Sequence, residues 1–87
     1  MKTPKEIQHE LSARERSLRK KQKMTLQQLA DASGVSLGSV KRFESSGEIS
    51  LQSMIKIAIA LGCEDDFSAI FAKNIPMSIE EIINGEI

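Results

Sequence analysis

Four helix-start signals recur along this chain, and they restrict its fold more than any other feature. In each, a Thr or Ser has an apolar residue directly before it and another apolar residue four positions after it. A hydroxyl at this position accepts a hydrogen bond from a free backbone N–H of the first helical turn, and the apolar pair fixes the direction of the chain. The four N-cap residues are Thr25, Ser36, Ser50 and Ser78. Because no segment alternates apolar and polar residues long enough for a strand, we predict an all-α fold.

These starts, together with helix stops, divide the chain into a compact five-helix domain and a short C-terminal arm. Gly62 has the position of a C-terminal cap, and Pro76 interrupts the pattern before the arm. Helices are expected over residues 4–21, 26–32, 37–45, 51–61 and 65–72, with a further short helix over residues 79–84. The domain then spans residues 1–73 and the arm residues 74–87. Its core is expected to contain stripes from the first and fourth helices: Ile7, Leu11, Leu18, Leu51, Met54, Ile57, Ala58 and Leu61.

The composition is that of a folded domain and argues against several classes of protein. Of the 87 residues, 40% are hydrophobic and 28% are charged. The longest apolar run, residues 57–61, is far shorter than the ~20 residues of a membrane span, and the charged N-terminal residues do not resemble a signal peptide. The single cysteine, Cys63, indicates a reducing compartment, so we expect a cytoplasmic protein. With one histidine and none of the common catalytic motifs, no enzyme activity, metal or cofactor is expected.

The net charge of zero conceals a division between two parts of the chain. Residues 1–42 contain 10 basic and 4 acidic residues, whereas residues 43–87 contain 2 basic and 8 acidic residues. Six of the basic residues lie between Arg14 and Lys23. Such asymmetry is typical of nucleic-acid-binding chains, but a solvated helix face gives the same pattern. The charge therefore needs a particular fold around it before it indicates DNA.

Residues 26–45 have the pattern of two helices joined by a tight turn. Only a short segment around Gly34 separates the two predicted helices, and glycine adopts positive φ without steric cost. Ala30 is small where the helices would approach each other. Four apolar residues can pack inside the angle: Leu29, Val35, Val40 and Phe43. This set predicts a helix-turn-helix, and the alternative is a plain helical hairpin.

The segments that carry this pattern resemble the lambda-repressor-like, or XRE-type, helix-turn-helix family. They are residues 25–30, 33–36, 40–44 and 51–62, and the resemblance covers about residues 11–71. It implies a five-helix DNA-binding domain whose third helix enters the major groove. It also implies a homodimer on a palindromic operator of double-stranded DNA, with half-sites about 34 Å apart.

The outward side of the third helix is predicted to read bases. The candidates are Leu37, Gly38, Ser39, Lys41 and Arg42. By resemblance, Leu37, Gly38 and Arg42 match the usual base readers of the family. The Arg42 guanidinium can reach O6 and N7 of one guanine, and Leu37 can contact a thymine methyl group. Alternatively, Arg42 is only a surface charge of the helix.

Phosphate contacts are expected at helix N-termini and at neighbouring polar or cationic side chains. The candidates are Lys23, Thr25, Gln27, Ser36, Ser45 and Ser46, with backbone N–H groups of the loop over residues 45–47. Two positions depart from the family pattern. Leu26 stands where the family commonly has a phosphate-binding Gln, and Glu48 lies in a loop that is often basic. Both departures predict weak binding by a monomer, with affinity supplied by dimerisation or a partner.

Two further sets of residues are assigned to structure and assembly. Arg19 and Glu44 match a family ion pair that ties the first helix to the end of the third. A second apolar surface is predicted for a homodimer or another protein, and the alternative is a wider core in the monomer. Its members are Ile55, Ile59, Phe67, Ile70, Phe71, Ile79, Ile82 and Ile83.

These observations predict a sequence-specific transcriptional repressor that acts by occupying an operator in bacterial cytoplasm. In size and layout the chain also resembles HipB-like antitoxins, which implies autoregulation and a kinase-like toxin as a partner. The alternative hypothesis is a protein-interaction module that keeps the helix-turn-helix shape and binds little DNA. Leu37, Gly38 and the acidic loop favour this alternative, whereas Lys41, Arg42 and the basic first helix favour repression.

Overall fold

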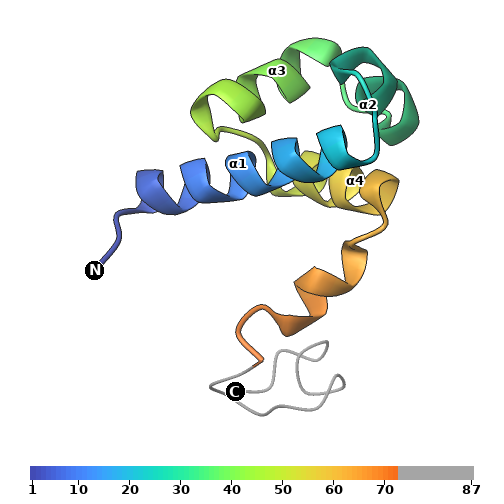
Figure 1. Ribbon diagram of the computed structural model, residues 1–87. Helices are drawn as coiled ribbons and strands as arrows, with labels where there is room; N and C mark the ends of the chain where they lie inside the picture. The colour runs from blue at the N-terminus through green and yellow to red at the C-terminus, as the bar shows by residue number, and fades with distance from the viewer. Residues whose placement is uncertain (73–87) are drawn as a thin grey trace.

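The computed structural model describes residues 1–72, and within them every regular element is a helix. The elements are α1 (Pro4–Lys21), α2 (Leu26–Ser33), α3 (Leu37–Ser46), α4 (Leu51–Leu61) and the 3₁₀ helix η1 (Glu64–Ala69). In Figure 1, α1 crosses the middle of the molecule and packs against α3, α2 and α3 lie together on one side, and η1 leads away from α4 on the other. The predicted all-α, lambda-repressor-like arrangement of five helices is confirmed.

Side chains cap the helices where the sequence predicts it. The hydroxyl groups of Thr25, Ser36 and Ser50 accept hydrogen bonds from N–H groups three residues later, at 3.0, 3.2 and 3.1 Å. Gln28 completes a reciprocal capping box with Thr25. These bonds satisfy donors that a helix start leaves free, so each helix begins at a defined residue. Ser78 and the helix predicted for the arm lie outside the described residues.

The fifth helix differs from the prediction in length and type. It was expected over residues 65–72, but it covers Glu64–Ala69 with 3₁₀ geometry. Ile70 has extended backbone angles, and Phe71 has φ of 65°, which no right-handed helix contains. The helical pattern of the sequence persists through these residues, but the backbone leaves it at Ile70.

One apolar cluster joins α2, α3 and α4. Its largest fully buried side chains are those of Leu29, Val40 and Ile57. The other buried members are Ala30, Val35, Phe43 and Leu61, with Leu11 and Leu18 of α1 packed against them. Val40 and Phe43 of α3 belong to this cluster, so the core determines which side of α3 faces inward.

Two residues predicted for the core are exposed instead. Ile7 is 46% exposed and Leu51 is 67% exposed. Ile7 lies in the first two turns of α1, outside the cluster that Leu11 and Leu18 join. Leu51 is the first residue of α4 and lies on the same side of that helix as Ile55 and Ile59, four and eight residues later. The buried stripe of α4 is therefore Ile57, Ala58 and Leu61, with Met54 half-buried.

A buried ion pair ties α1 to the end of α3. The Arg19 guanidinium donates from Nε to Glu44 Oε2 at 2.7 Å and from Nη2 to Glu44 Oε1 at 2.9 Å. Both residues are only 8% exposed. Arg19 also donates from Nη1 to the carbonyl oxygen of Met24 at 2.8 Å, directly before the cap of α2. A bidentate pair of this geometry fixes orientation as well as distance, so it sets the relation between three helices.

Arg16 adds a second, more exposed cation to this pair. Its Nη2 donates to the backbone carbonyl oxygen of Glu44 at 2.9 Å, and its Nε donates to Oε1 at 3.3 Å. The carbonyl lies in the last turn of α3, where a cation offsets the negative end of the helix dipole. Burial would raise the pKa of Glu44, but hydrogen bonds from Arg19, from the neighbouring Glu15 carboxyl group and from Arg16 together outweigh it and hold the pKa below its ordinary value. The sequence pattern predicts Arg19 as a partner of Glu44 but does not predict Arg16.

Glu15, one turn before Arg19 on α1, is the buried acid that the sequence analysis missed. Both of its carboxyl oxygens are buried without a hydrogen-bond partner among the residues that the structure describes. Burial, followed by the neighbouring Glu44 carboxylate, raises the pKa of Glu15 from 4.5 to about 8. Glu15 is therefore mostly protonated at neutral pH, and it tolerates the position because the neutral form costs less to bury.

Replacing Glu44 should lower stability far more than replacing a neighbour on the outer side of α3. Glu44→Ala leaves the Arg19 guanidinium buried and unpaired, which costs about 3–5 kcal/mol of unfolding free energy. The control, Lys41→Ala, changes an exposed side chain and should stay within about 0.5 kcal/mol of wild type. Urea unfolding followed by circular dichroism measures both. Equal unfolding midpoints for the two variants would contradict the structural role of the pair.

Glu15 should make the free energy of unfolding depend on pH, and replacing it with a neutral residue should remove this dependence. The folded protein keeps a proton on Glu15 that the unfolded chain releases above pH 4.5, so stability falls as pH rises from about 4.5 to about 8. Glu15→Gln should be more stable than wild type above this window, by up to about 5 kcal/mol for a shift of this size, and the two proteins should converge below it. Urea midpoints measured across the range test this, and a difference that does not change with pH would refute it.

Candidate nucleic-acid interface

A short left-handed turn joins α2 to α3. Gly34 has φ of 75° and donates its N–H to the carbonyl oxygen of Ala30 at 2.9 Å. Glycine adopts this angle without the strain that a Cβ would bring. Val35 then returns into the core, and Ser36 begins α3. The turn thus sets α3 at an angle to α2 with one side of α3 packed and the other side open, the arrangement of a helix-turn-helix.

The two sides of α3 have different environments. Val40, Phe43 and Glu44 are buried against the rest of the molecule. Lys41 and Arg42 are exposed, and neither takes part in an ion pair among residues 1–72. Two adjacent cations on an open helix side are available to a polyanion without first breaking an internal contact.

Three predicted base readers near the start of α3 have different environments. Leu37 is half-buried and packs against the core, so part of its side chain is engaged in the fold. Gly38 is exposed, and a Cβ built on it would meet no atom within 4 Å. The fold therefore does not require glycine at position 38. Ser39 is half-buried and accepts a hydrogen bond from the Ser36 hydroxyl at 2.9 Å.

A polar hollow of about 280 Å³ lies beside Arg42. It is lined by Ser39, Arg42, Glu48, Ile49, Ser50 and Ser53. Two of these residues, Ser50 and Ser53, belong to the cap and first turn of α4, where free N–H groups favour an anion. Sequence analysis recognised Ser50 as a cap, but it did not place that helix start next to Arg42, because the proximity is created by tertiary packing.

The N-terminus of α2 is exposed, with three of the predicted phosphate-binding residues beside it. Lys23 and Thr25 precede the helix, and Gln27 lies in its first turn. Lys23 has φ of 59°, so the chain turns sharply before α2. The Gln27 side chain donates to Asp31 at 2.9 Å, an exposed bond that competes with any phosphate for the amide.

The loop after α3 offers fewer free donors than the sequence predicts. Ser45 and Ser46 form the last turn of α3, and both hydroxyls donate to the carbonyl oxygen of Arg42, at 3.2 and 2.7 Å. The N–H of Gly47 donates to the carbonyl oxygen of Phe43 at 2.8 Å, and that of Glu48 donates to the Ser46 hydroxyl. The expectation of a free N–H group at Gly47 is therefore wrong, because the chain uses that group to end the helix.

The apolar residues assigned to one partner surface belong to two different surfaces. Phe67 and Ile70 of η1 and its end line a groove against α1 and α4. Ile59 is 56% exposed and does not line this groove, and neither does Ile55. Phe71 is 87% exposed. The predicted arm residues Ile79, Ile82 and Ile83 lie outside the described residues.

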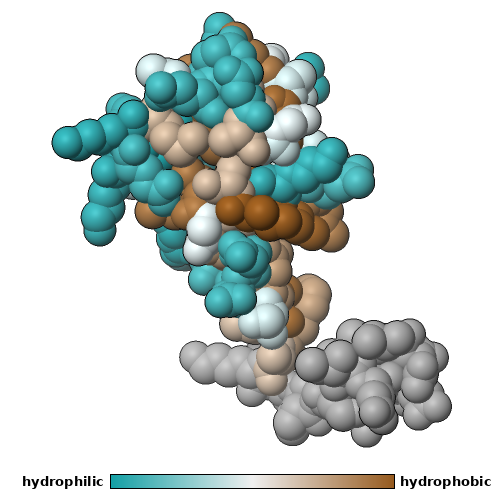
Figure 2. All heavy atoms as spheres, turned by 90° about the vertical axis from the view of Figure 1, so that its right-hand side faces the viewer, coloured by the Kyte–Doolittle hydropathy of each residue, from teal (hydrophilic) through white to brown (hydrophobic). Residues whose placement is uncertain are grey.

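Apolar atoms also reach the surface elsewhere. In the view of Figure 2, strongly hydrophobic atoms occupy the middle of the face and are bordered by hydrophilic side chains.

Within residues 1–72, no helix has the length and apolar character needed to cross a membrane. The same residues contain no group of three or more His, Cys, Asp or Glu side chains placed to hold a metal ion.

Comparison with known families agrees with the geometry of α2, the turn and α3. A family model described as helix-turn-helix matches residues 16–67, which is 52 of the 87 residues and includes all of α2, α3 and α4. Comparison with curated proteins and with solved structures gives no significant match. Because the matched part exceeds half of the chain, the protein belongs to the XRE-type helix-turn-helix family of DNA-binding domains.

Proposed function

We propose that this protein is a sequence-specific transcriptional repressor that binds an operator through the outer side of α3. The observation that carries the proposal is the pair of exposed cations on α3, Lys41 and Arg42, of which Arg42 lies beside the N-terminus of α4. The inner side of α3 is held by the core and by Glu44, so the outer side is presented as a rigid surface. An α-helix of this kind fits the major groove of B-DNA.

Arg42 is the residue expected to discriminate between sequences. Its guanidinium can donate to O6 and N7 of one guanine, and the hollow beside it leaves space for the edge of a base or a phosphate. Lys41 and the N-termini of α2 and α4 would contact phosphates, which position the protein without reading sequence. No cofactor is needed for this mechanism, because repression follows from occupying the operator.

Glu48 limits the affinity of a single domain. Its carboxylate lines the same hollow as Arg42 and would lie near the DNA backbone. A fixed negative charge there repels phosphate. Arg42 is the one cation among the residues that line the hollow, so it alone offsets this charge there. This is consistent with a protein that binds tightly only as a dimer on two half-sites, where the second contact is effectively intramolecular.

The outer side of α4 is the surface that we assign to the homodimer. Leu51, Ile55 and Ile59 follow one another at intervals of four residues, and Leu51 and Ile59 are 67% and 56% exposed. A continuous apolar stripe of this kind is costly to leave in water. Pairing two copies of α4 would cover it.

The antitoxin hypothesis would add a kinase-like toxin as a second partner and make the repressor autoregulatory. It derives from the resemblance in size and layout, and the gene beside this one is the observation that would decide it. The alternative function, an interaction module with little DNA binding, is favoured by Glu48 in the hollow. A repressor active on its own operator would act in the cytoplasm.

Arg42→Ala should weaken binding to the DNA upstream of this gene by about 5- to 150-fold, since one bidentate contact to guanine is lost. Glu48→Gln should act in the opposite direction and strengthen binding several-fold, because it removes a negative charge near phosphate. A gel shift at two salt concentrations measures both, and wild-type affinity should fall steeply at the higher salt.

The matched control for this experiment is Glu64→Gln, the same change in η1, which packs on α4 rather than on α3. It should leave the shift unchanged. If the wild-type protein shifts no DNA at either salt concentration, the proposed repressor function fails and the interaction module is favoured.

Ile59→Ser should convert the dimer to a monomer. Placing a hydroxyl at one end of the apolar stripe should raise the dimer dissociation constant by about tenfold or more. Sedimentation equilibrium at tens of micromolar measures this, with Lys56→Ser, an exposed residue of the same helix, as the control. A monomeric wild-type protein at these concentrations would contradict the homodimer.

A further inference from the structure

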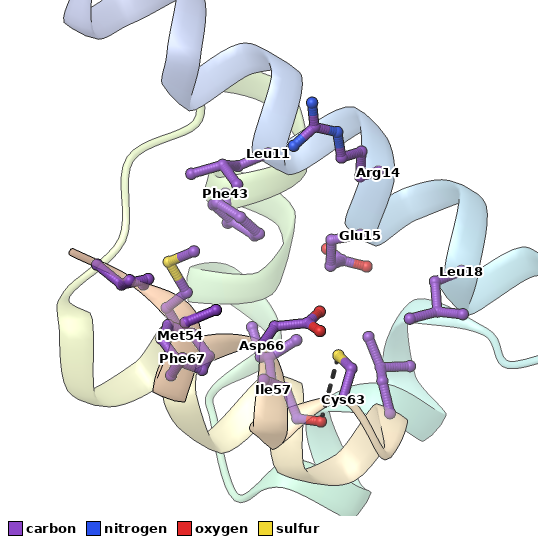
Figure 3. A pocket seen from close by; sticks show the side chains of 14 residues that line it. Leu11, Arg14, Glu15, Leu18, Phe43, Met54, Ile57, Cys63, Asp66 and Phe67 are labelled. Atoms are coloured by element: carbon purple, nitrogen blue, oxygen red, sulfur yellow. Dashed lines mark hydrogen bonds between the residues drawn. The ribbon is translucent and has the colours of Figure 1, made fainter. Parts of the chain in front are cut away.

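An apolar groove lies between α1, α4 and η1, on elements that the proposed DNA contacts do not use. Its volume is about 440 Å³. Figure 3 shows side chains from all three elements directed into it, including Leu11, Met54 and Phe67. Ile70, which is 50% exposed, lies at its edge, and Arg14 belongs to its lining. A groove with so much apolar lining is unfavourable in water unless something covers it.

A buried polar group in the wall indicates that the surroundings of the groove are incomplete. Glu15 lines the groove, and its two carboxyl oxygens have no hydrogen-bond partner among residues 1–72. Its side chain points inward in Figure 3, toward the space between α1 and η1. Buried polar atoms in native proteins are almost always satisfied. Once protonated, Glu15 can donate one hydrogen bond to the neighbouring Glu44 carboxylate, but its other oxygen still has no donor among residues 1–72. The groove therefore lacks apolar cover and a donor for that oxygen.

We infer that residues 78–84 of the same chain cover this groove, with Ile79, Ile82 and Ile83 packed on its apolar lining. The three isoleucines have the i, i+3, i+4 spacing of one helix face, and Ser78 with Glu81 has the pattern of a capping box. Ser78 and Asn84 also supply groups that can hydrogen bond to a protonated carboxyl group.

The position where the described chain ends favours this occupant over a second copy. The described residues end at Ala72, only two residues after Ile70 at the edge of the groove. The link from residue 73 to residue 77 spans up to about 17 Å when extended, which is enough for the segment to fold back. A segment tethered this closely has an effective concentration in the millimolar range, far above that of a separate molecule.

Charge agrees with the same assignment. The segment contains Glu80 and Glu81 and no cation, whereas α1 presents Arg14 at the groove and is basic over its second half. Acidic residues flanking the isoleucine face would therefore lie near α1 rather than near the acidic start of η1. The inference does not depend on DNA binding, so the gel shift above and the experiment below can fail independently.

Cys63 provides a single reporter for the cover. It is the only cysteine of the chain, it lines the groove, and its Sγ donates to the carbonyl oxygen of Ala58 at 3.6 Å. Its rate of reaction with a chromogenic disulfide reagent measures how open the groove is, because only an accessible thiolate reacts. The full-length protein should react slowly.

The test compares the full-length protein with the double variant Ile79→Ser, Ile82→Ser. Replacing two isoleucines of the proposed cover should open the groove and raise the Cys63 rate at least about tenfold. Ile87→Ser, the same substitution in the same tail but beyond the stripe, should leave the rate unchanged. A synthetic peptide of residues 73–87, added in excess to the double variant, should restore slow reaction, which it could not do if the variant were unfolded.

Three results would overturn the inference. Equal Cys63 rates in wild type and the double variant would show that the isoleucines do not cover the groove. A wild-type rate that falls as protein concentration rises would assign the cover to a second copy. Rapid hydrogen exchange of the wild-type amides of residues 82–84, measured without any variant, would show that the segment forms no stable helix on the protein.

Discussion

The orientation of α3 depends on one buried contact, the bidentate pair between Arg19 and Glu44. Its two hydrogen bonds join α1 to the last turn of α3, and a third joins the same guanidinium to the chain just before α2. The apolar core alone would hold the helices together, but nondirectional packing leaves their angles less tightly defined. The ion pair supplies direction, and Arg16 reinforces it at the backbone of Glu44. Because both partners are buried, the pair is costly to break even if its net contribution to stability is small.

The same helix, α1, takes part in two regions with different chemistry. Arg19 contacts Glu44 on α3, while Glu15, four residues earlier, lines the groove against η1. Glu15 is neutral at pH 7 largely because it is buried, whereas Glu44 keeps its charge because guanidinium groups surround it. Two glutamates close together thus have opposite pKa shifts, and only one of them belongs to an ion pair.

Local signals in the sequence predict much of this fold, and tertiary contacts account for the remainder. The caps at Thr25, Ser36 and Ser50 depend on hydrogen bonds between residues three positions apart, so the sequence predicts them directly. The exposure of Leu51 depends on which side of α4 meets the core, and the sequence does not reveal this because α4 has apolar residues on both sides.

The candidate site divides in the same way. The outward position of Lys41 and Arg42 follows from the helical spacing of Val40 and Phe43, which identify the inner side. The hollow that brings Ser50 and Ser53 next to Arg42 joins residues eight or more positions apart on different helices, and no local pattern contains that information. Glu15 was missed for a related reason, because a glutamate on a highly charged helix gives no sign that it is buried.

The division of α3 into an engaged inner side and an open outer side has a consequence for how such proteins diverge. Gly38, Lys41 and Arg42 make no contact on which the fold depends, and there is room for a side chain at position 38. A duplicated gene can therefore exchange these three residues freely while it keeps Val40, Phe43 and Glu44. If α3 reads the operator as proposed, new target sequences can arise by small steps without passing through unfolded intermediates.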